Sequence, residues 1–224
     1  MLHAPTLPSP RDISDTLTGA GNPAGNGWRW SVELSVAGLV LAAGGGRRYG
    51  GPKALVRHDG SLLVERAVST VRDGGCSQIV VVLGAAADEV RSTAHLGDVT
   101  IVENEGWKSG MGSSLKVGLE ALGEADVDSV VVLLVDTPGV TAEAVRRVRE
   151  KSGRDSLATA TYGSRRGHPV LLGRDHWAGV AILAIGDVGA RAYLSARSGS
   201  VQTVPCEDIA DDTDMDVPET PHPA

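Results

Sequence analysis

Positively charged residues and glycines gather in one short stretch of this chain, residues 41–53. Five of the eight residues 44–51 are glycine, Arg48 stands among them, and Lys53 follows shortly after. Glycine lets successive backbone N–H groups approach an anion because no Cβ atom interferes, and such groups form an anion-binding nest. Arg48 and Lys53 would add full positive charges to that nest. The stretch therefore predicts a binding site for a triphosphate.

Two well-known phosphate-binding loops do not fit this stretch. A Walker A loop ends in Gly-Lys-Ser/Thr, whereas Lys53 follows proline and precedes Ala54. A dinucleotide-binding fingerprint that begins at Gly44 would need glycine where Tyr49 stands. The order present from Leu41 to Lys53 is Leu-Ala-Ala-Gly-x-x-x-Arg-x-Gly-x-x-Lys. It resembles the nucleotidyltransferases that attach a nucleoside monophosphate to a phosphorylated partner.

A single carboxylate, Asp136, follows the most apolar stretch of the chain, residues 129–135. That stretch predicts a buried central strand, and open α/β sheets bind ligands at the carboxyl ends of such strands. Mg²⁺ binds through one or two carboxylates together with substrate phosphates. Asp136 could instead cap the helix expected over residues 141–151, but Thr141 is better placed for that role. We therefore predict that Asp136 holds a magnesium ion.

Glycines and serines lead into a helix expected from Ser113 to about residue 122. Gly110, Ser113 and Ser114 could present backbone and hydroxyl groups to a flat polar ligand. From spacing alone, however, an ordinary capped helix start explains them better, since serine is a common N-cap. Trp107, just before them, could belong to the core or to the wall of a pocket, and we favour the core.

The second half of the chain carries weaker signals. Two strands are expected within residues 156–172, joined through a basic turn at Arg165 and Arg166. His168, taken by itself, is more often a structural histidine than a ligand. Asp187 stands at the first turn of a further expected helix, where a carboxylate suits the helix dipole.

The acidic tail, residues 207–219, contains seven acidic residues and no basic one. Such a run is usually a solvated, mobile end of the chain. It could alternatively fold back and supply a second carboxylate to the metal. The composition leaves both interpretations open.

Strands and helices are expected to alternate around these residues. Apolar runs predict buried strands, and helices are expected between them. Alternation of this kind implies right-handed crossovers and a largely parallel sheet, which places the chain in the α/β class. The expected strands cover residues 35–40, 78–83, 99–102 and 129–135, and the expected helices cover residues 61–73, where Ser61 would be the cap, and 85–93.

The composition limits the classes of protein that remain. The 224 residues suit one domain, and no apolar run is long enough to span a membrane. A net charge of −7 argues against general nucleic-acid binding. Cys76 and Cys206 are isolated, which favours a reducing, cytoplasmic location. We expect a mobile extension without a secretory signal over residues 1–33, the domain over 34–220 and a short tail over 221–224.

Taken in order, these motifs resemble the molybdenum cofactor cytidylyltransferase group within the MobA-like nucleotidyltransferases. The most specific parts are Gly-His-Pro-Val at residues 167–170 and Gly-Asp-x-Gly-Ala-Arg at residues 186–191. They favour the cytidylyl branch over guanylyltransferases of the same fold. The chain departs from the family at Thr137, where glutamine is common, and around Val217 in the tail motif. These departures concern the acceptor more than the chemistry.

The resemblance implies a Rossmann-like three-layer nucleotidyltransferase fold and a Mg²⁺-dependent transfer of CMP from CTP to the terminal phosphate of a molybdopterin-type cofactor. The same chemistry with another nucleotide (GTP) or another acceptor (a sugar phosphate or a phospholactate) is an alternative. A non-catalytic nucleotide-binding role in cofactor maturation also stays open. The implied partners are a nucleoside triphosphate and a phosphorylated pterin-type small molecule, with a molybdoenzyme or its chaperone as a further candidate.

The resemblance also implies a role for each site residue. Catalysis is assigned to Arg48, Lys53 and Asp136, and metal binding to Asp136 and Asp216. The acceptor side is assigned to His168, Asp187 and Arg191. The remaining contacts, with the triphosphate and the nucleobase, are assigned to Leu41, Ala42, Ala43, Gly44, Gly45, Gly46, Gly110, Ser113 and Ser114.

Overall fold

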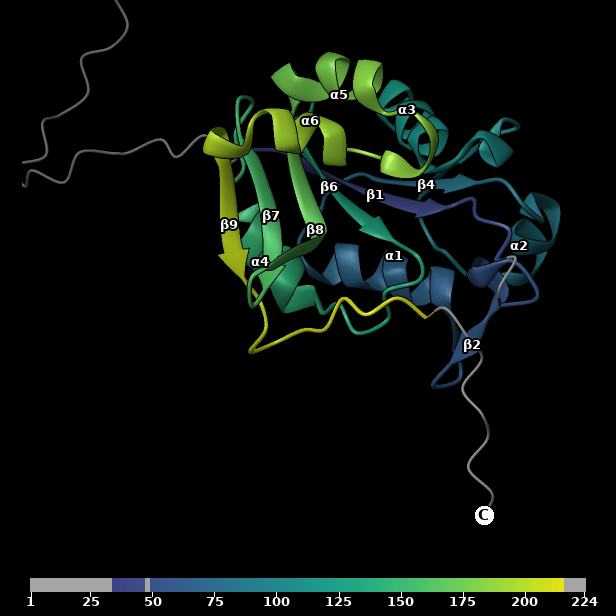
Figure 1. Cartoon of the computed structure of the whole chain (residues 1–224). Coiled ribbons are helices and arrows are strands. Elements are labelled where there is room, and N and C mark those ends of the chain that lie inside the picture. The colour runs from purple at the N-terminus through teal and green to yellow at the C-terminus, as the bar shows by residue number, and fades with distance from the viewer. Residues whose placement is uncertain (1–33, 47–48, 216–224) are drawn as a thin grey trace, which may run out of the picture. The chain divides into compact units, whose positions relative to one another are not determined.

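A seven-stranded sheet forms the centre of the domain (Figure 1). The computed structural model describes residues 34–46 and 49–215. The strand order is β5-β4-β1-β6-β8-β7-β9, and a separate two-stranded hairpin is formed by β2 and β3. The strands are β1 (Val36–Ala42), β2 (Arg57–His58), β3 (Ser61–Leu62), β4 (Ile79–Leu83), β5 (Thr100–Glu103), β6 (Ser129–Leu134), β7 (Leu157–Tyr162), β8 (Arg165–Gly173) and β9 (Val201–Pro205).

The sheet is mostly parallel, as predicted. β5, β4, β1 and β6 form one parallel half. β8 runs antiparallel to both of its neighbours, β6 and β7, whereas β9 pairs with β7 in parallel. We call β8, β7 and β9 the mixed half of the sheet. β6 lies at the centre, as its apolar sequence indicates.

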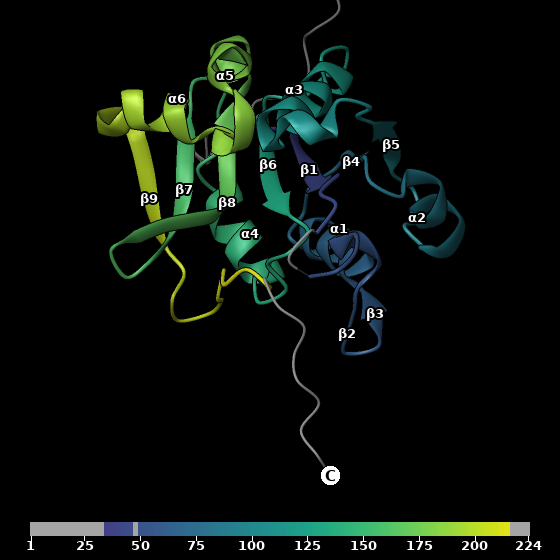
Figure 2. The ribbon, with the colours of Figure 1, turned by 45° about the vertical axis from the view of Figure 1, so that its right-hand side comes forward.

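Helices cover both faces of the sheet and complete three layers (Figures 1 and 2). α1 and α4 pack together on one face, and α3, α5 and α6 lie on the other. Among the described residues, no helix is both long and apolar enough to cross a membrane. The helices are α1 (Leu63–Asp73), α2 (Ala87–Thr93), α3 (Met111–Ala121), α4 (Ala142–Arg149), α5 (Trp177–Leu183) and α6 (Arg191–Ala196).

Strand β1 shows why the sheet is buried on both faces. Side chains of a strand alternate between faces. Val36 and Val40 therefore join the core under α1 and α4, while Leu39 and Leu41 join the core under α3 and α5. All seven residues of β1 are buried, which is why this strand is a continuous apolar run in the sequence.

Several predicted boundaries differ from the structure. Ser61 is not the cap of α1: it pairs in the β2–β3 hairpin, and Leu62 precedes the helix while its N–H donates to Glu65 (2.9 Å). Arg165 and Arg166 lie in β8 rather than in the turn before it. Thr141 does cap α4, since its Oγ1 accepts from the N–H of Ala144 (3.2 Å). Helix α5 and strand β9 were not expected from the sequence.

The acidic tail folds back onto the domain over the residues that the structure describes. The N–H of Asp211 donates to the carbonyl of Gly139 (3.1 Å), and the N–H of Met215 donates to the carbonyl of Asp136 (2.9 Å). The proposed extension (residues 1–33) and the last nine residues lie outside the described residues, so the predicted domain boundaries remain predictions.

Candidate functional site

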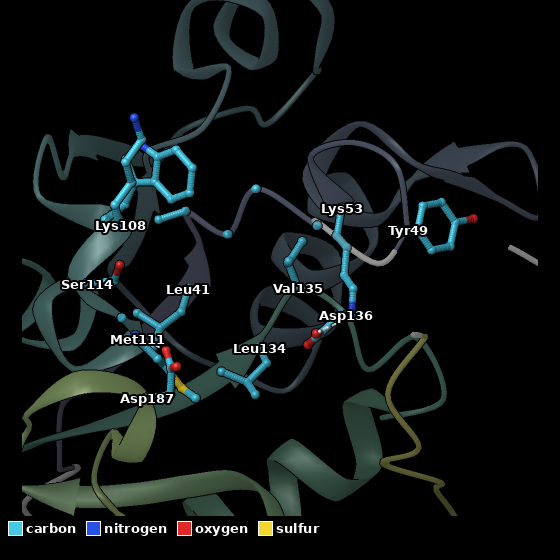
Figure 3. Close-up of a pocket in the computed structure, with 16 residues that line it drawn as sticks. Leu41, Tyr49, Lys53, Lys108, Met111, Ser114, Leu134, Val135, Asp136 and Asp187 are labelled. Carbon is cyan, nitrogen blue, oxygen red and sulfur yellow. Dashed lines mark hydrogen bonds and ion pairs between the residues drawn. The ribbon is translucent and has the colours of Figure 1, made fainter. Parts of the chain in front are cut away.

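A cavity of about 560 Å³ opens where the loops after β1 and β6 separate (Figure 3). From β1 the chain crosses to β4 and β5 on one side, whereas β6 lies on the other side of β1. Crevices outside the carboxyl ends of parallel strands at such a point are where α/β sheets bind ligands. The lining residues are Leu41, Ala43, Gly44, Gly45, Gly46, Tyr49, Lys53, Trp107, Lys108, Gly110, Met111, Ser114, Leu134, Val135, Asp136 and Asp187.

The glycine-rich loop forms one wall of this cavity. Gly46 has φ +54°, and a Cβ atom there would lie 1.9 Å from the carbonyl oxygen of Gly51. The Gly46 carbonyl in turn accepts the N–H of Gly50 (2.9 Å), so the loop closes on itself. Only glycine fits this turn, which explains part of the glycine density in the sequence. Arg48 lies outside the described residues.

Lys53 and Asp136 meet in the cavity although 83 residues separate them in the sequence. Lys53 opens a short 3-10 helix (Lys53–Leu55), and Asp136 lies two residues beyond β6. Lys53 Nζ donates to Asp136 Oδ2 (2.8 Å), and the two side chains are 13% and 23% exposed. Figure 3 shows the pair beside Tyr49 and Val135. A triphosphate and a cation would give the ammonium and the carboxylate new partners of opposite charge.

The donor set fits a metal that is shared with a substrate. No group of three or more His, Cys, Asp or Glu side chains in residues 34–46 and 49–215 is arranged to hold a metal ion. Mg²⁺, however, commonly takes one or two carboxylates and completes its shell with phosphate oxygens and water. Asp136 can supply one such carboxylate. Asp216, predicted as the second, lies outside the described residues, although the bond from the Met215 N–H brings the tail to Asp136.

The opposite end of the cavity is organised by Asn104, which sequence reasoning missed. This side chain is only 4% exposed, and its Nδ2 donates to Ser113 Oγ (2.7 Å) and Ser114 Oγ (3.0 Å). The Ser113 hydroxyl itself donates a hydrogen bond to the Gly110 carbonyl (2.8 Å). Ser114 lines the cavity and donates no hydrogen bond that is seen among the described residues. Its hydroxyl is therefore available as a donor to a ligand.

Asp187 also lies at this end of the cavity. Its Oδ1 accepts the N–H of Met111, the first residue of α3 (3.3 Å). Gly110 has φ +112°, and a Cβ atom there would lie 2.4 Å from the carbonyl carbon of Gly186 and 2.8 Å from Asp187 Oδ1. The segment at Gly186 thus packs closely against the start of α3, and the two sequence motifs form one wall of the cavity.

Trp107 contributes to both the core and the cavity. It packs beside the apolar residues under α3, as expected, and also lines the cavity. A Cβ atom at Gly45 would lie 2.9 Å from its ring, so the glycine-rich loop rests on the indole. The ammonium group of Lys108 lies 5.6 Å from the centre of that ring.

Four of the predicted contact residues do not line the cavity. Ala42 points to the opposite face of the sheet because side chains of β1 alternate, and Ser113 is turned toward backbone carbonyls. Arg191 begins α6, and His168 lies in β8. The other predicted contacts within the described residues, including Lys53 and Asp136, all line it.

The charges of neighbouring site residues nevertheless act on the pKa of His168. Burial lowers the pKa of His168 to about 4; the charges of Asp212 and Asp136 act to raise this pKa, and Arg191 lowers it further. Its imidazole is therefore neutral at physiological pH. The main-chain N–H of His168 donates to Asp212 Oδ2 (3.2 Å), and its carbonyl accepts from Tyr162 (2.7 Å).

The comparisons with known proteins agree with this geometry. Residues 38–201 match the model of the MobA-like NTP transferase domain, and the chain belongs to this family. It is 38% identical to a nicotine blue oxidoreductase of Paenarthrobacter nicotinovorans, over 82% of this chain and 93% of that protein. It is 32% identical to a probable molybdenum cofactor guanylyltransferase of Bacillus cytotoxicus, over 61% of this chain and 67% of that protein.

A solved structure shows the same fold. The crystal structure of Rv0371c from Mycobacterium tuberculosis is 28% identical and has a TM-score of 0.67, covering 77% of this chain and 88% of that one. A structure of Rv0371c in complex with manganese has a TM-score of 0.64 at 26% identity, with the same coverage. The mostly parallel sheet with helices on both faces is thus a nucleotidyltransferase fold.

Proposed function

Starting from membership of the MobA-like NTP transferase family, we propose that this protein transfers CMP from CTP to the terminal phosphate of a molybdopterin-type cofactor and releases pyrophosphate. The observation that carries the proposal is the pair of Lys53 and Asp136 beside the glycine-rich loop. A cation for phosphates and a carboxylate for a metal stand 2.8 Å apart in a cavity at the carboxyl edge of the sheet. Nucleotidyl transfer needs this combination of charges.

In the proposed reaction, an oxygen of the acceptor phosphate attacks the α-phosphorus of the triphosphate. The bond from the α-phosphorus to the bridging oxygen breaks, and pyrophosphate leaves with that electron pair. Lys53 and loop N–H groups would hold the triphosphate and stabilise the charge on the leaving group, together with Arg48. Mg²⁺, held by Asp136 and Asp216, would supply further neutralisation of phosphate charge. The acceptor phosphate is an anion at neutral pH, so no general base is required.

The nucleobase would lie at the end formed by Ser114, Gly110 and Trp107. The Ser114 hydroxyl can donate to a carbonyl oxygen of cytosine, but also to O6 of guanine. The preference for CTP therefore rests on the resemblance of residues 167–170 and 186–191 to the cytidylyl branch. The relative from Bacillus cytotoxicus carries a guanylyltransferase name, so GTP is the alternative to test.

The acceptor would lie beside Asp136, toward His168 and Arg191. These two residues influence each other electrostatically and lie outside the lining of the nucleotide cavity. A neutral imidazole and a guanidinium could both donate hydrogen bonds to a phosphorylated pterin. A molybdoenzyme or its chaperone would receive the product, and the reaction would take place in the cytoplasm.

A substrate panel tests this proposal. The panel combines CTP or GTP with a molybdopterin-type cofactor, a sugar phosphate or a phospholactate, each with Mg²⁺, and measures the release of pyrophosphate. Release that depends on CTP and the pterin cofactor supports the proposal. Release with another pair would keep the chemistry and change the substrate, whereas triphosphate binding without release would support a non-catalytic role.

A second candidate function is the reduction of an organic substrate. It is favoured by one observation: the relative at 38% identity, of which 93% is covered, is named a nicotine blue oxidoreductase. The same cavity, with Trp107 in its wall, would then hold the substrate. Oxidation of NADH or NADPH that depends on added nicotine blue, followed by absorbance, would support this candidate. The absence of such oxidation together with pyrophosphate release in the panel would exclude it.

A further inference from the structure

Asp212 is a buried carboxylate of the acidic tail to which the proposed mechanism assigns no role. It is 5% exposed, although it belongs to a run of acids that the sequence would place in solvent. Its Oδ1 accepts a hydrogen bond from the guanidinium of Arg165, and its Oδ2 accepts the main-chain N–H of His168 (3.2 Å). A buried charge needs such partners, so this carboxylate is held at one defined place.

The backbone opposite Asp212 is shaped to admit it. A Cβ atom added to Gly167 would lie 1.6 Å from Asp212 Oδ2 and 3.1 Å from the ring of Tyr162. The carboxylate therefore occupies the space that a side chain at residue 167 would need. The glycine of the Gly-His-Pro motif can be explained by this close approach.

The main chain of His168 depends on side chains for its hydrogen bonds. In β8, Gly167 pairs with Ala160 of β7, but Val170 pairs with Thr159, so a bulge leaves His168 and Pro169 unpaired. Within the described part of the chain, neither neighbouring strand pairs with His168. Asp212 accepts the N–H of His168, and the hydroxyl of Tyr162 donates to the carbonyl of His168 (2.7 Å). Bulges near active sites commonly direct a side chain in this way.

The tail links this bulge to the candidate metal ligand. We call residues 206–215 the C-terminal strap. The Asp211 N–H donates to the Gly139 carbonyl (3.1 Å), and a Cβ atom at Gly139 would lie 2.5 Å from the Asp211 carbonyl oxygen. Met215 then donates to the carbonyl of Asp136 (2.9 Å). The strap thus runs from the His168 bulge to the carboxyl end of β6.

From these contacts we infer that Asp212 is a positioning residue: it holds the His168 bulge in place beside Asp136. The bulge would then form the wall that the phosphorylated acceptor contacts. The inference rests on the proposed function, in which the acceptor lies on this side of Asp136. Asp212 would not touch the reacting atoms. It would act through the main chain of His168, so its loss should weaken binding of the acceptor and spare binding of the triphosphate.

The kinetic test compares three variants of the full chain. In Asp212→Ala the acceptor KM should rise about tenfold, because the His168 N–H and the Arg165 guanidinium lose their partner, while the triphosphate KM stays within about twofold. In Asp212→Asn the acceptor KM should lie between those of wild type and Asp212→Ala, since the amide oxygen of asparagine can still accept the N–H of His168. Asp208→Ala is the control. Asp208 lies in the same strap and accepts two hydrogen bonds of 2.8 Å from Arg147 of α4, but it is exposed. Both KM values should stay unchanged in this variant.

Equal increases of both KM values, or a loss of kcat that only follows a loss of thermal stability in both Asp212 variants, would overturn the positioning role. A second readout does not require turnover: the exchange rate of the His168 amide hydrogen, measured by NMR on the full chain. It should rise about tenfold in Asp212→Ala relative to wild type and to Asp208→Ala. An unchanged rate would overturn the inference even if the enzyme is active. Wild-type protein that is silent with every acceptor would instead count against the proposed function, and the amide exchange would still decide the role of Asp212.

Discussion

The two halves of the central sheet build their parts of the site by different means. In the parallel half, the loop after β1 and the start of α3 each form a wall of the cavity within one short segment of the sequence, with glycines at the close approaches. In the mixed half, the main chain of His168 is held by side chains: Tyr162, six residues away in the sequence, and Asp212, 44 residues away, which also binds Arg165. A site of the first kind leaves a motif in the sequence. A site of the second kind exists only once the chain has folded.

The largest effect is expected at the pair of Lys53 and Asp136, which joins the segment after the glycine-rich loop to the end of β6. Lys53→Ala and Asp136→Ala should each fold normally and lose about 10²–10³ in kcat, because the first removes a positive charge that would stabilise the transition state and the second removes a ligand of the Mg²⁺ that would do the same. Pyrophosphate release measures the loss, with Lys151→Ala, at an exposed lysine, as the control. Near-normal turnover in either variant would contradict the assignment of the site.

In the mixed half, Gly167→Ala should reproduce the effect of losing Asp212 without removing any polar group. The new methyl group must displace the carboxylate, since the Cβ would lie 1.6 Å from Oδ2. We expect an increase of about tenfold in the acceptor KM with little change for the triphosphate. Gly199→Ala is the matched control, because a Cβ there meets no atom within 4 Å. An unchanged acceptor KM in Gly167→Ala would remove the distinction between the two halves.

A smaller effect is expected at the nucleobase end of the parallel half. Ser114→Ala removes a hydroxyl whose hydrogen is available to the ligand, so the triphosphate KM should rise about two- to tenfold. Ser113→Ala serves as the comparison, since Ser113 already donates to Gly110 (2.8 Å) and does not line the cavity. If both substitutions raise the KM equally, Ser114 has no specific role toward the base.

The smallest effect concerns the pH dependence of stability at His168. Its pKa is about 4 in the folded protein and 6.5 ordinarily, so between these values the unfolded chain binds a proton that the folded protein does not. The free energy of unfolding should therefore fall as the pH is lowered from about 6.5 toward 4. His168→Gln should weaken this dependence, as measured by urea denaturation at several pH values in this range. Equal pH dependence in wild type and variant would show that His168 is not held in its neutral form.

The parallel half was also the better predicted part of the fold. The strand expected over residues 129–135 is β6 (Ser129–Leu134), because strands buried on both faces are continuous apolar runs. β9 escaped prediction: it is a short edge strand in which Val201 and Val204 are buried while two polar residues between them are exposed. α5 (Trp177–Leu183) has the exposed Ile182 (72%) in its last turn, which obscures its amphipathic pattern.

The site residues that were predicted are those with a local signal in the sequence. Lys53 and Asp136 were predicted because each stands next to a strong local pattern, a glycine-rich loop and a buried strand. Asn104 and Asp212 were missed, since a lone amide and one acid within an acidic run give no local signal. Their roles depend on contacts that span 10 and 44 residues, respectively, and that only the fold creates.

The most direct test of the account is pyrophosphate release by wild-type protein from CTP with Mg²⁺ and a molybdopterin-type cofactor, measured beside Lys53→Ala. The account predicts release that requires both substrates and falls about 10²–10³-fold in the variant. No release from wild type would contradict CTP and this cofactor as the substrates, and equal release by the two proteins would contradict the claim that the cavity between β1 and β6 is a nucleotidyl-transfer site.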